Sequence, residues 1–297
     1  MFKTEAFVSE KIWGYERWIL STHKAGESLA DKSTEFIGGK KLSSVIGADY
    51  PLLVKVIQAD ETLSVQVHPD DEYARLHENS AGKTECWYIL DAKEGASLIY
   101  GLNGIYSREE LKAAIENQKL DNYLRSVPVS KGDFVFIPAG TVHAIQGGLR
   151  LLEIQQSSDI TYRLYDWGRP REIHVEKSLD VIKPFPPDSL NVERPFGGSF
   201  SCPYFNLEKY DYTVRGSVCF AKKAAQKAAG EQNGQEPTPA MKTSWLSLFI
   251  ISGTGTFESN TGERLSVQAE DCVIVGAEEK ITLIPDAGST LSVMHIS

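Results

Sequence analysis

The stretch Gly132-Asp-Phe-Val-Phe-Ile-Pro-Ala-Gly-Thr-Val-His143 carries the strongest fold signal in the chain. Within it, Asp133–Ile137 has the composition of a short strand, and Pro138 and Gly140 are residues that build tight turns. The next strand begins at His143, so the turn directs this imidazole inward. We therefore expect two strands joined by a tight turn, with a histidine facing the interior of a β-structure.

A second stretch, Leu63-Ser-Val-Gln-Val-His68, alternates apolar and polar side chains. Because successive side chains of a strand point to opposite faces, Ser64, Gln66 and His68 share one face and the three apolar residues share the other. The apolar face is suited to a core. Polar groups directed into a barrel interior are costly unless something there satisfies them, and a metal ion would do so.

A third stretch, Lys83-Thr-Glu-Cys-Trp-Tyr-Ile-Leu90, places a carboxylate at the start of an otherwise apolar strand. Burying Glu85 without a partner would be expensive, and coordinating a cation removes that penalty. Lys83 lies two residues earlier and shares the face of Glu85 if the segment is extended. It is therefore a candidate for contacting a substrate.

Short strands bounded by Gly, Pro, Asn or Asp fill much of the chain, which indicates a barrel or a double-sheet jelly roll. We expect strands at Leu52–Gln58, Thr62–His68, Cys86–Leu90, Asp133–Ile137, Leu149–Gln155, Ile160–Tyr165, Trp245–Ile251, Cys272–Val275, Ile281–Ile284 and Leu291–Ile296. Helical segments are expected at Asp71–Glu78, Ser107–Leu124 and Ile173–Ile182. The second begins with Ser107 and Glu110 in capping-box spacing.

The segment Lys183-Pro-Phe-Pro-Pro-Asp188 is the best candidate for a linker, because proline cannot continue a helix and stiffens the chain that follows. We expect a catalytic domain over residues 1–186, with a helical insertion near 107–125, and a second β-domain over 187–297. Residues near 221–241 have almost no large apolar side chain and are expected to form a mobile surface loop.

Composition restricts the possible partners. Of 297 residues, 41% are hydrophobic and 24% are charged, as in soluble globular proteins. A net charge of −9 disfavours nucleic acid but leaves room for a small anionic substrate met by a few local cations. No stretch approaches the roughly 18 to 20 apolar residues of a membrane helix, and the start of the chain lacks the layout of a signal peptide. We expect a cytoplasmic location, and nothing in the sequence distinguishes a monomer from a homodimer.

The spacing Gly132-x5-Pro138-x-Gly140-x2-His143 resembles the second motif of the cupin superfamily. The first cupin motif usually contains His-x-His followed by Glu, whereas this chain has Gln66 at the first position. The resemblance implies a mainly β fold, a cupin barrel (double-stranded β-helix or jelly roll) with helical insertions. Past residue 190 only the general outline of a second, smaller cupin-like domain is recognisable, without metal ligands.

The departure at Gln66 matches a narrower pattern. Gln-x-His-Pro-Asp-Asp, then Gly-Lys-Thr-Glu, then Pro-x-Gly-x-x-His-Ala resembles the type I phosphomannose isomerases. The resemblance includes Trp13-Gly14, Leu53–Ile57 and the run Ser157–Asp166, and it extends from about residue 10 to residue 182, in the manner of the short bacterial form. It implies reversible isomerisation of mannose 6-phosphate and fructose 6-phosphate through a cis-enediol(ate).

The resemblance also implies one zinc ion per chain, bound by Gln66, His68, Glu85 and His143. Two imidazoles, a carboxylate and an amide oxygen suit Zn²⁺, although ligand type alone leaves other divalent ions open. The arginine of the family's Thr-Tyr-Arg block corresponds to Arg163, which implies a catalytic role. Because a guanidinium does not readily lose its proton, we assign it charge stabilisation or orientation.

Other polar residues are candidates for proton transfer and for substrate contact. Glu153 and Asp159 are the candidate general bases, and for each the alternative is a structural ion pair with Arg163 or Arg150. The 6-phosphate needs cationic or backbone N–H partners. Substrate-binding candidates are Lys83, Lys55 and Trp13, and for Trp13 a place in the core is at least as plausible.

Two other readings are open. One is a cupin of another reaction class, such as an iron oxygenase that uses two histidines and a carboxylate. Gln66 and the Thr-Tyr-Arg block weigh against it. The other is a non-catalytic sensor of sugar phosphates on the same scaffold. Nothing in the sequence predicts inactivity.

Overall fold

The computed structural model describes residues 1–219, 245–276 and 279–297, so the loop predicted near 221–241 lies outside the described residues. The chain forms two compact units, and both consist of segments that are not contiguous in sequence. The larger unit comprises Phe7–Gly26 and Leu52–Gly197; the smaller unit comprises Met1–Ala6, Glu27–Pro51 and Gly198–Ser297.

This division differs from the predicted one, in which residues 1–186 formed one domain. The N-terminal strand β1 (Phe2–Glu5) pairs antiparallel with β21 (Cys272–Gly276) and with β4 (Leu29–Ala30), so both N-terminal segments join the smaller unit. At the other boundary, β14 (Val192–Glu193) pairs with β10 (Phe134–Ile137) and extends the larger unit past residue 186. Sequence patterns identify strands, but the partner of a strand depends on contacts made far along the chain.

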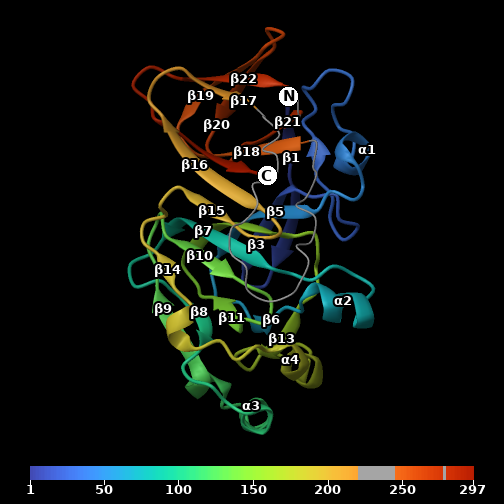
Figure 1. Ribbon diagram of the computed structural model, residues 1–297, viewed down its shortest axis with the longest axis vertical. Helices are drawn as coiled ribbons and strands as arrows, with labels where there is room; N and C mark the ends of the chain where they lie inside the picture. Colours follow the sequence, from blue (N-terminus) through green and yellow to red (C-terminus); the bar gives the residue numbers. More distant parts are fainter. Residues whose placement is uncertain (220–244, 277–278) are drawn as a thin grey trace, which may run out of the picture. The chain divides into compact units, whose positions relative to one another are not determined.

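The larger unit is built from a seven-stranded and a five-stranded antiparallel sheet (Figure 1). The first has the order β14-β10-β7-β12-β5-β3-β2, with β7 Glu85–Ala92, β12 Leu149–Gln156, β5 Leu52–Ala59, β3 Gly14–Leu20 and β2 Phe7–Lys11. The second has the order β13-β6-β11-β8-β9, with β13 Tyr162–Tyr165, β6 Val65–Val67, β11 His143–Ile145, β8 Ser97–Leu102 and β9 Leu124–Pro128. The predicted mainly β, cupin-like fold is confirmed.

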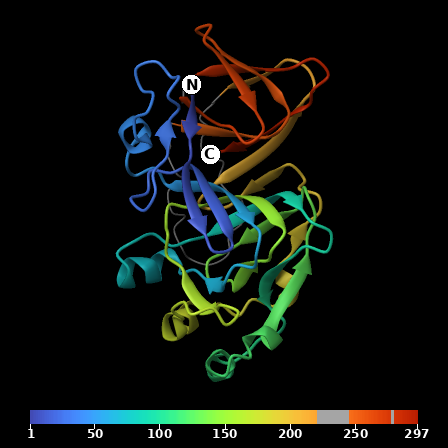
Figure 2. The same ribbon diagram turned by 180° about the vertical axis from the view of Figure 1, so that it is seen from behind.

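The two sheets of the larger unit pack face to face around a shared apolar core. One buried cluster combines Ile57, Trp87 and Leu151 from the seven-stranded sheet with Leu98 and Ile145 from the five-stranded sheet. The outer face of the five-stranded sheet supports a second buried cluster to which the helices contribute. Figure 2 shows the far edge of the seven-stranded sheet, where β2 and β3 form a hairpin.

The larger unit also contains four short helical segments: α2 (Asp71–His77), α3 (Arg108–Glu116), η1 (Leu120–Tyr123) and α4 (Val175–Val181). A further 3₁₀ turn, η2, spans Pro187–Ser189. The α4 helix packs on β13 and β6, and α3 packs on α4 (Figure 1). The capping box predicted for Ser107 and Glu110 is present, and the predicted helix over Ser107–Leu124 is divided into α3 and the short 3₁₀ helix η1. None of the described helices is long and apolar enough to cross a membrane.

The smaller unit also contains two antiparallel sheets, with the orders β15-β16-β23-β18-β21-β1-β4 and β17-β22-β19-β20. Its remaining elements are α1 (Leu42–Ile46), β15 (Ser199–Ser201), β16 (Asn206–Tyr212), β17 (Gly216–Cys219), β18 (Trp245–Ser252), β19 (Thr254–Ser259), β20 (Arg264–Gln268), β22 (Lys280–Pro285) and β23 (Leu291–Ile296). Its core is a cluster of buried aliphatic and aromatic side chains, including Leu248, Phe257 and Val293.

Candidate metal centre and active site

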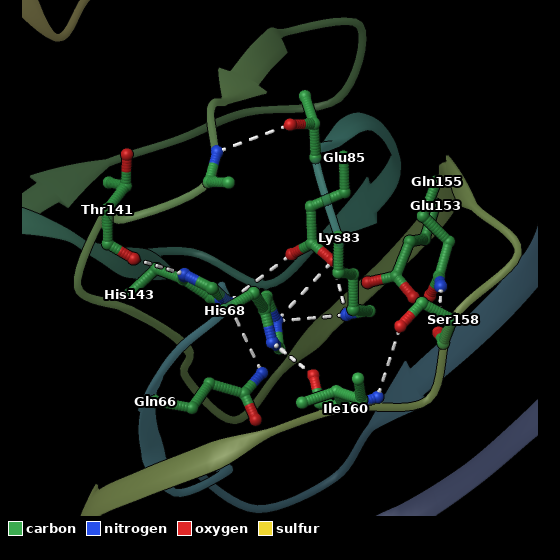
Figure 3. Close-up of polar contacts among 12 residues, drawn as sticks. Gln66, His68, Lys83, Glu85, Thr141, His143, Glu153, Gln155, Ser158 and Ile160 are labelled. Atoms are coloured by element: carbon green, nitrogen blue, oxygen red, sulfur yellow. Dashed lines mark hydrogen bonds and ion pairs between the residues drawn. The ribbon is translucent and has the colours of Figure 1, made fainter. Parts of the chain in front are cut away.

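Three strands of the larger unit bring the predicted metal ligands together. Gln66 on β6 and His143 on β11 lie directly opposite each other in an antiparallel ladder, so their side chains share a face. His68 follows β6 directly, and Glu85 begins β7 of the facing sheet. Figure 3 shows the four side chains pointing toward one another.

The turn predicted between β10 and β11 holds the two histidines in place. Gly140 has a φ of 92°, in the left-handed region that favours glycine. Its N–H donates to the His68 carbonyl over 2.9 Å, which ties the end of β6 to the turn. A Cβ at this position would lie 2.9 Å from the Val181 carbonyl oxygen, so the turn needs a glycine for space as well as for conformation.

The cluster is tight, and its two imidazoles and its carboxylate are buried. His143 Nε2 lies 3.3 Å from Glu85 Oε1, and His68 Nε2 lies 3.6 Å from Glu85 Oε2. The Gln66 side-chain nitrogen lies 3.3 Å from His143 Nε2. His68, Glu85 and His143 are each at most 1% exposed, and their candidate ligand atoms all lie within 4.8 Å of one another. The structure therefore places all four predicted ligands in one site.

Backbone carbonyls set the tautomer of both histidines. His68 Nδ1 lies 2.8 Å from the Ile160 carbonyl oxygen, and His143 Nδ1 lies 2.9 Å from the Thr141 carbonyl oxygen. Since a carbonyl can only accept, each Nδ1 carries the proton and donates. Both Nε2 lone pairs therefore face Glu85, which is the arrangement of metal-binding imidazoles whose second nitrogen is held by the protein.

The electrostatics of the cluster also fit a cation. Burial and the Lys83 ammonium hold the pKa of His68 well below its usual range, and burial lowers the pKa of His143 to about 3. Both imidazoles are therefore neutral, the form that binds metals. Burial raises the pKa of Glu85 to about 7 against the effect of Lys83. Among the described residues Glu85 Oε1 has no hydrogen-bond donor, so this donor set fits a divalent cation.

Lys83, predicted to contact the substrate, belongs to the same cluster. Its ammonium donates to His68 Nε2 over 2.9 Å and also to Glu85 Oε2. The side chain is only 4% exposed. A buried positive charge therefore lies directly against two of the four predicted ligands.

Glu153 and Lys55 form a buried ion pair beside the cluster. Lys55 Nζ lies 2.9 Å from Glu153 Oε1, and the Trp87 indole N–H donates to Oε2 over 3.0 Å. Burial raises the pKa of Glu153, but the Lys55 and Lys83 ammonium groups and the hydrogen bonds from Lys55 and Trp87 together bring it down to about 2. The alternative partners considered for Glu153, Arg163 and Arg150, are not the ones that the structure provides.

Asp159 and Trp13 lie outside the cluster. The Asp159 side chain is half exposed, with Oδ1 3.8 Å from His23 Nε2. The strand predicted from Ile160 begins only at Tyr162, so Asp159 lies before the strand that carries Arg163. Trp13 is buried among apolar side chains of the larger unit's core, the place that the sequence left open as its alternative.

Arg163 lies across from Gln66 in the β13–β6 ladder, at the edge of the cluster. One terminal nitrogen of its guanidinium donates to the Glu172 carbonyl over 2.8 Å, and its buried Nε has no acceptor among the described residues. Burial and the neighbouring Arg171 lower the pKa of this guanidinium. Arg163 therefore retains hydrogen-bonding capacity for an incoming anion.

Two polar groups that sequence reasoning did not assign also belong to this region. Gln155 lies across from Glu85 in the β12–β7 ladder, and its amide nitrogen donates to the Gln156 and Ser158 carbonyls. Its Oε1 is buried and has no donor in the described part of the chain (Figure 3). Trp87 is the second group. The alternation along Leu149–Gln155 could have identified Gln155, but the hydrogen bond of Trp87 carries no sequence signal.

The fold and the site together define a cupin-type β-protein with a histidine–carboxylate cluster inside its barrel. The model of the phosphomannose isomerase type I catalytic domain matches residues 9–96. Mannose-6-phosphate isomerase of Streptococcus mutans is 44% identical over 260 residues, covering 81% of this chain and 76% of the relative. Mannose-6-phosphate isomerase ManA of Bacillus subtilis is 40% identical over 228 residues, covering 68% and 71%.

A crystal structure of the Bacillus subtilis mannose 6-phosphate isomerase superimposes with a TM-score of 0.81 at 28% identity, covering 100% of this chain and 99% of that one. The chain belongs to the type I mannose-6-phosphate isomerase family.

Proposed function

We propose that the protein interconverts D-mannose 6-phosphate and D-fructose 6-phosphate. The observation that carries the proposal is the buried cluster of two neutral imidazoles around a carboxylate, in a chain that belongs to the mannose-6-phosphate isomerase family. Aldose–ketose isomerisation moves a proton between C2 and C1 and develops negative charge on the oxygens in between. A site for it needs cationic groups around those oxygens and a base that reaches both carbons.

One zinc ion per chain is the proposed cofactor, held by His68, Glu85, His143 and Gln66. Gln66 would use its amide oxygen, since exchanging oxygen and nitrogen in this side chain changes only which of them faces His143. The bound ion would supply Lewis-acid polarisation of substrate oxygens. The neutral imidazoles and the unpartnered Glu85 oxygen support this assignment.

The protein's own cations would stabilise the negative charge of a cis-enediolate. Lys83 lies within the cluster, and the buried Nε of Arg163, at its edge, has no acceptor among the described residues. The guanidinium keeps its proton, so Arg163 would orient and stabilise the substrate without acting as the base. Arg163 is also available to the 6-phosphate. Lys55 is the least suited of the predicted phosphate ligands, because Glu153 already neutralises it.

For the general base we propose Asp159. Of the two predicted bases, Glu153 has both carboxylate oxygens engaged, whereas the Asp159 carboxylate is half exposed, with one oxygen 3.8 Å from His23, and is accessible to a substrate that enters from solvent. It also precedes Ile160, whose carbonyl orients His68. Asp159→Asn should abolish solvent-hydrogen exchange at substrate C2, and unchanged exchange would remove Asp159 from this role.

The test of the whole proposal is a coupled assay of mannose 6-phosphate conversion, before and after chelation and with zinc added back. Activity should disappear with the chelator and return with zinc. His143→Ala should be inactive under all conditions, whereas His77→Ala, which removes a histidine on the surface of α2, should behave as the wild type. No turnover by a folded, zinc-loaded protein would favour a sugar-phosphate sensor. Stoichiometric iron with oxygen uptake would favour an oxygenase. Whichever of these activities it has, we propose that the protein is located in the cytoplasm.

A further inference from the structure

A row of buried polar side chains crosses the inner face of the seven-stranded sheet next to the metal cluster. Lys55 on β5 lies directly across from Glu153 on β12, and Glu153 lies directly across from Trp87 on β7. Residues two apart on a strand share a face, so the neighbouring row contains Gln155 and Glu85. The polar row therefore borders the metal row on the same face of the sheet.

On its other side the row borders an apolar layer. The row after Lys55, Glu153 and Trp87 consists of Ile57, Leu151 and Ile89, all within the buried core cluster. The inner face of the sheet thus changes over three successive rows, from the row with the predicted metal ligand Glu85, to the ion pair, to hydrocarbon. Lys55 and Glu153 are both buried here, so solvation by water does not account for two charges at this position.

The three side chains satisfy one another almost completely. Both carboxylate oxygens of Glu153 are engaged, one by the Lys55 ammonium at 2.9 Å and the other by the Trp87 indole at 3.0 Å. None of the three residues is more than 6% exposed. A general base must direct a carboxylate oxygen at a substrate carbon, whereas both oxygens of Glu153 are held by donors within this buried row.

The last residue of the row, Trp87, contacts a predicted metal ligand. The Trp87 ring packs edge-on against the His143 imidazole, with ring centroids 5.4 Å apart and an interplanar angle of 75°. Trp87 also follows Glu85 by two residues on the same face of β7. The hydrogen bond from its indole N–H to Glu153 fixes the rotation of the ring, and the ring in turn limits the positions of the imidazole.

We infer that Lys55, Glu153 and Trp87 form a positioning network that holds His143 for the metal ion and sets the affinity of the site, and that Glu153 transfers no proton in the reaction. The inference rests on the metal site proposed above. Lys55 keeps Glu153 ionised, Glu153 orients the indole, and the indole supports the imidazole. Groups that orient metal-binding histidines in this way typically change metal affinity about 10- to 100-fold when they are removed.

The test measures zinc affinity by competition with a chromophoric chelator, separately from turnover. Trp87→Phe keeps an aromatic ring beside His143 but removes the indole donor, and Glu153→Gln disrupts the ion pair. Each should weaken zinc binding by about 10- to 100-fold. At saturating zinc each variant should retain hydrogen exchange at substrate C2 within about tenfold of the wild type. The double variant Trp87→Phe/Glu153→Gln should bind zinc no more weakly than the weaker-binding single variant, because both changes break the same network.

Two further variants distinguish a specific loss of zinc affinity from a general loss of folding. Lys55→Met combined with Glu153→Gln removes both charges together but keeps an amide acceptor for the Trp87 indole, so it should recover most of the zinc affinity lost in Glu153→Gln alone. Glu110→Gln makes the same chemical change in the exposed capping box of α3 and should leave the affinity unchanged. Thermal unfolding confirms that each variant is folded.

Three results would overturn the proposal in distinguishable ways. Wild-type zinc affinity in Trp87→Phe would show that the indole hydrogen bond does not position His143. Unchanged affinity in Glu153→Gln, with exchange at C2 reduced about a thousandfold, would make Glu153 the base. A wild-type protein that binds no zinc would instead remove the metal site on which the inference rests.

Discussion

The two units of this chain are built alike but fill their interiors differently. Each has two antiparallel sheets around an apolar core. The larger unit buries two lysines, two glutamates and two histidines near one end of that core: Lys55, Lys83, Glu85, Glu153, His68 and His143. Among the described residues of the smaller unit no Lys, Arg, Asp or Glu is buried, and the buried polar groups are serines and His295.

The larger unit buries charged groups that lower its stability but form the proposed site, whereas the described part of the smaller unit does not. Buried charges lower stability unless they are paired or bind a cation, so a sheet that is selected only to fold fills its inner face with hydrocarbon, as the smaller unit does. The larger unit keeps charges at adjacent positions of one sheet because together they create a site. Among the described residues only His68, Glu85 and His143 form a group able to hold a metal ion.

The largest expected effect is the loss of a ligand from the larger unit. Glu85→Gln keeps the volume of the side chain but removes the negative charge between two imidazoles, so zinc binding and isomerase activity should fall together, with turnover reduced about a thousandfold or more. Metal content by mass spectrometry and the coupled assay measure both. Full activity without bound metal would contradict the proposed role of the metal ion.

Lys83→Met should destabilise the protein mainly when zinc is removed. Without the ammonium, the buried Glu85 carboxylate loses its partner, which typically lowers the free energy of unfolding by about 3 to 5 kcal/mol. Bound zinc would replace that partner. Denaturant unfolding with and without zinc should therefore show a larger zinc-dependent gain for the variant than for the wild type. An equal gain would mean that Lys83 does not compensate Glu85.

Matched truncations in the two cores sharpen the comparison. Leu248→Ala in the smaller unit and Leu151→Ala in the larger unit both remove a fully buried leucine side chain and should each lower the free energy of unfolding by about 2 to 5 kcal/mol. Only Leu151→Ala should also weaken zinc binding, because Leu151 shares a face with Glu153 two residues away. A change in zinc affinity in Leu248→Ala would show that zinc binding does not depend on the larger unit alone.

The smallest effect is a pH dependence carried by the smaller unit. Burial lowers the pKa of His295 to about 4 although Glu208 faces it, while Tyr210 and Tyr212 pack against it. The unfolded chain takes up this proton near pH 6.5, before the folded protein does. The stability that His295 contributes is therefore present above pH 6.5 and lost as the pH falls toward 4, by up to about 3 kcal/mol.

Urea unfolding between pH 4 and 7 tests this prediction. His295→Phe should flatten the slope in that window and leave isomerase activity at neutral pH unchanged, because the residue lies outside the proposed site. A slope as steep as that of the wild type would assign the dependence to other groups.

Local patterns predicted a large share of the fold and of the site. The capping box of α3 was predicted correctly, and so was the turn at Gly140, because both depend on residues that are close in sequence. Strand β13 is shorter than expected because the stretch before Tyr162, which includes Asp159, is irregular. Alternation holds only where the chain is extended.

The sequence alone determined the residues that converge on the proposed metal. The period of two along each strand, the turn before His143 and the matched motifs placed Gln66, His68, Glu85 and His143 on inward faces. The identity of the charged partners, in contrast, became clear only from the three-dimensional structure. The pairing of Lys55 with Glu153, and the assignment of the N-terminal strand to the smaller unit, depend on strand register between segments about 100 or more residues apart. Register depends on packing across the whole sheet, and no local pattern encodes it.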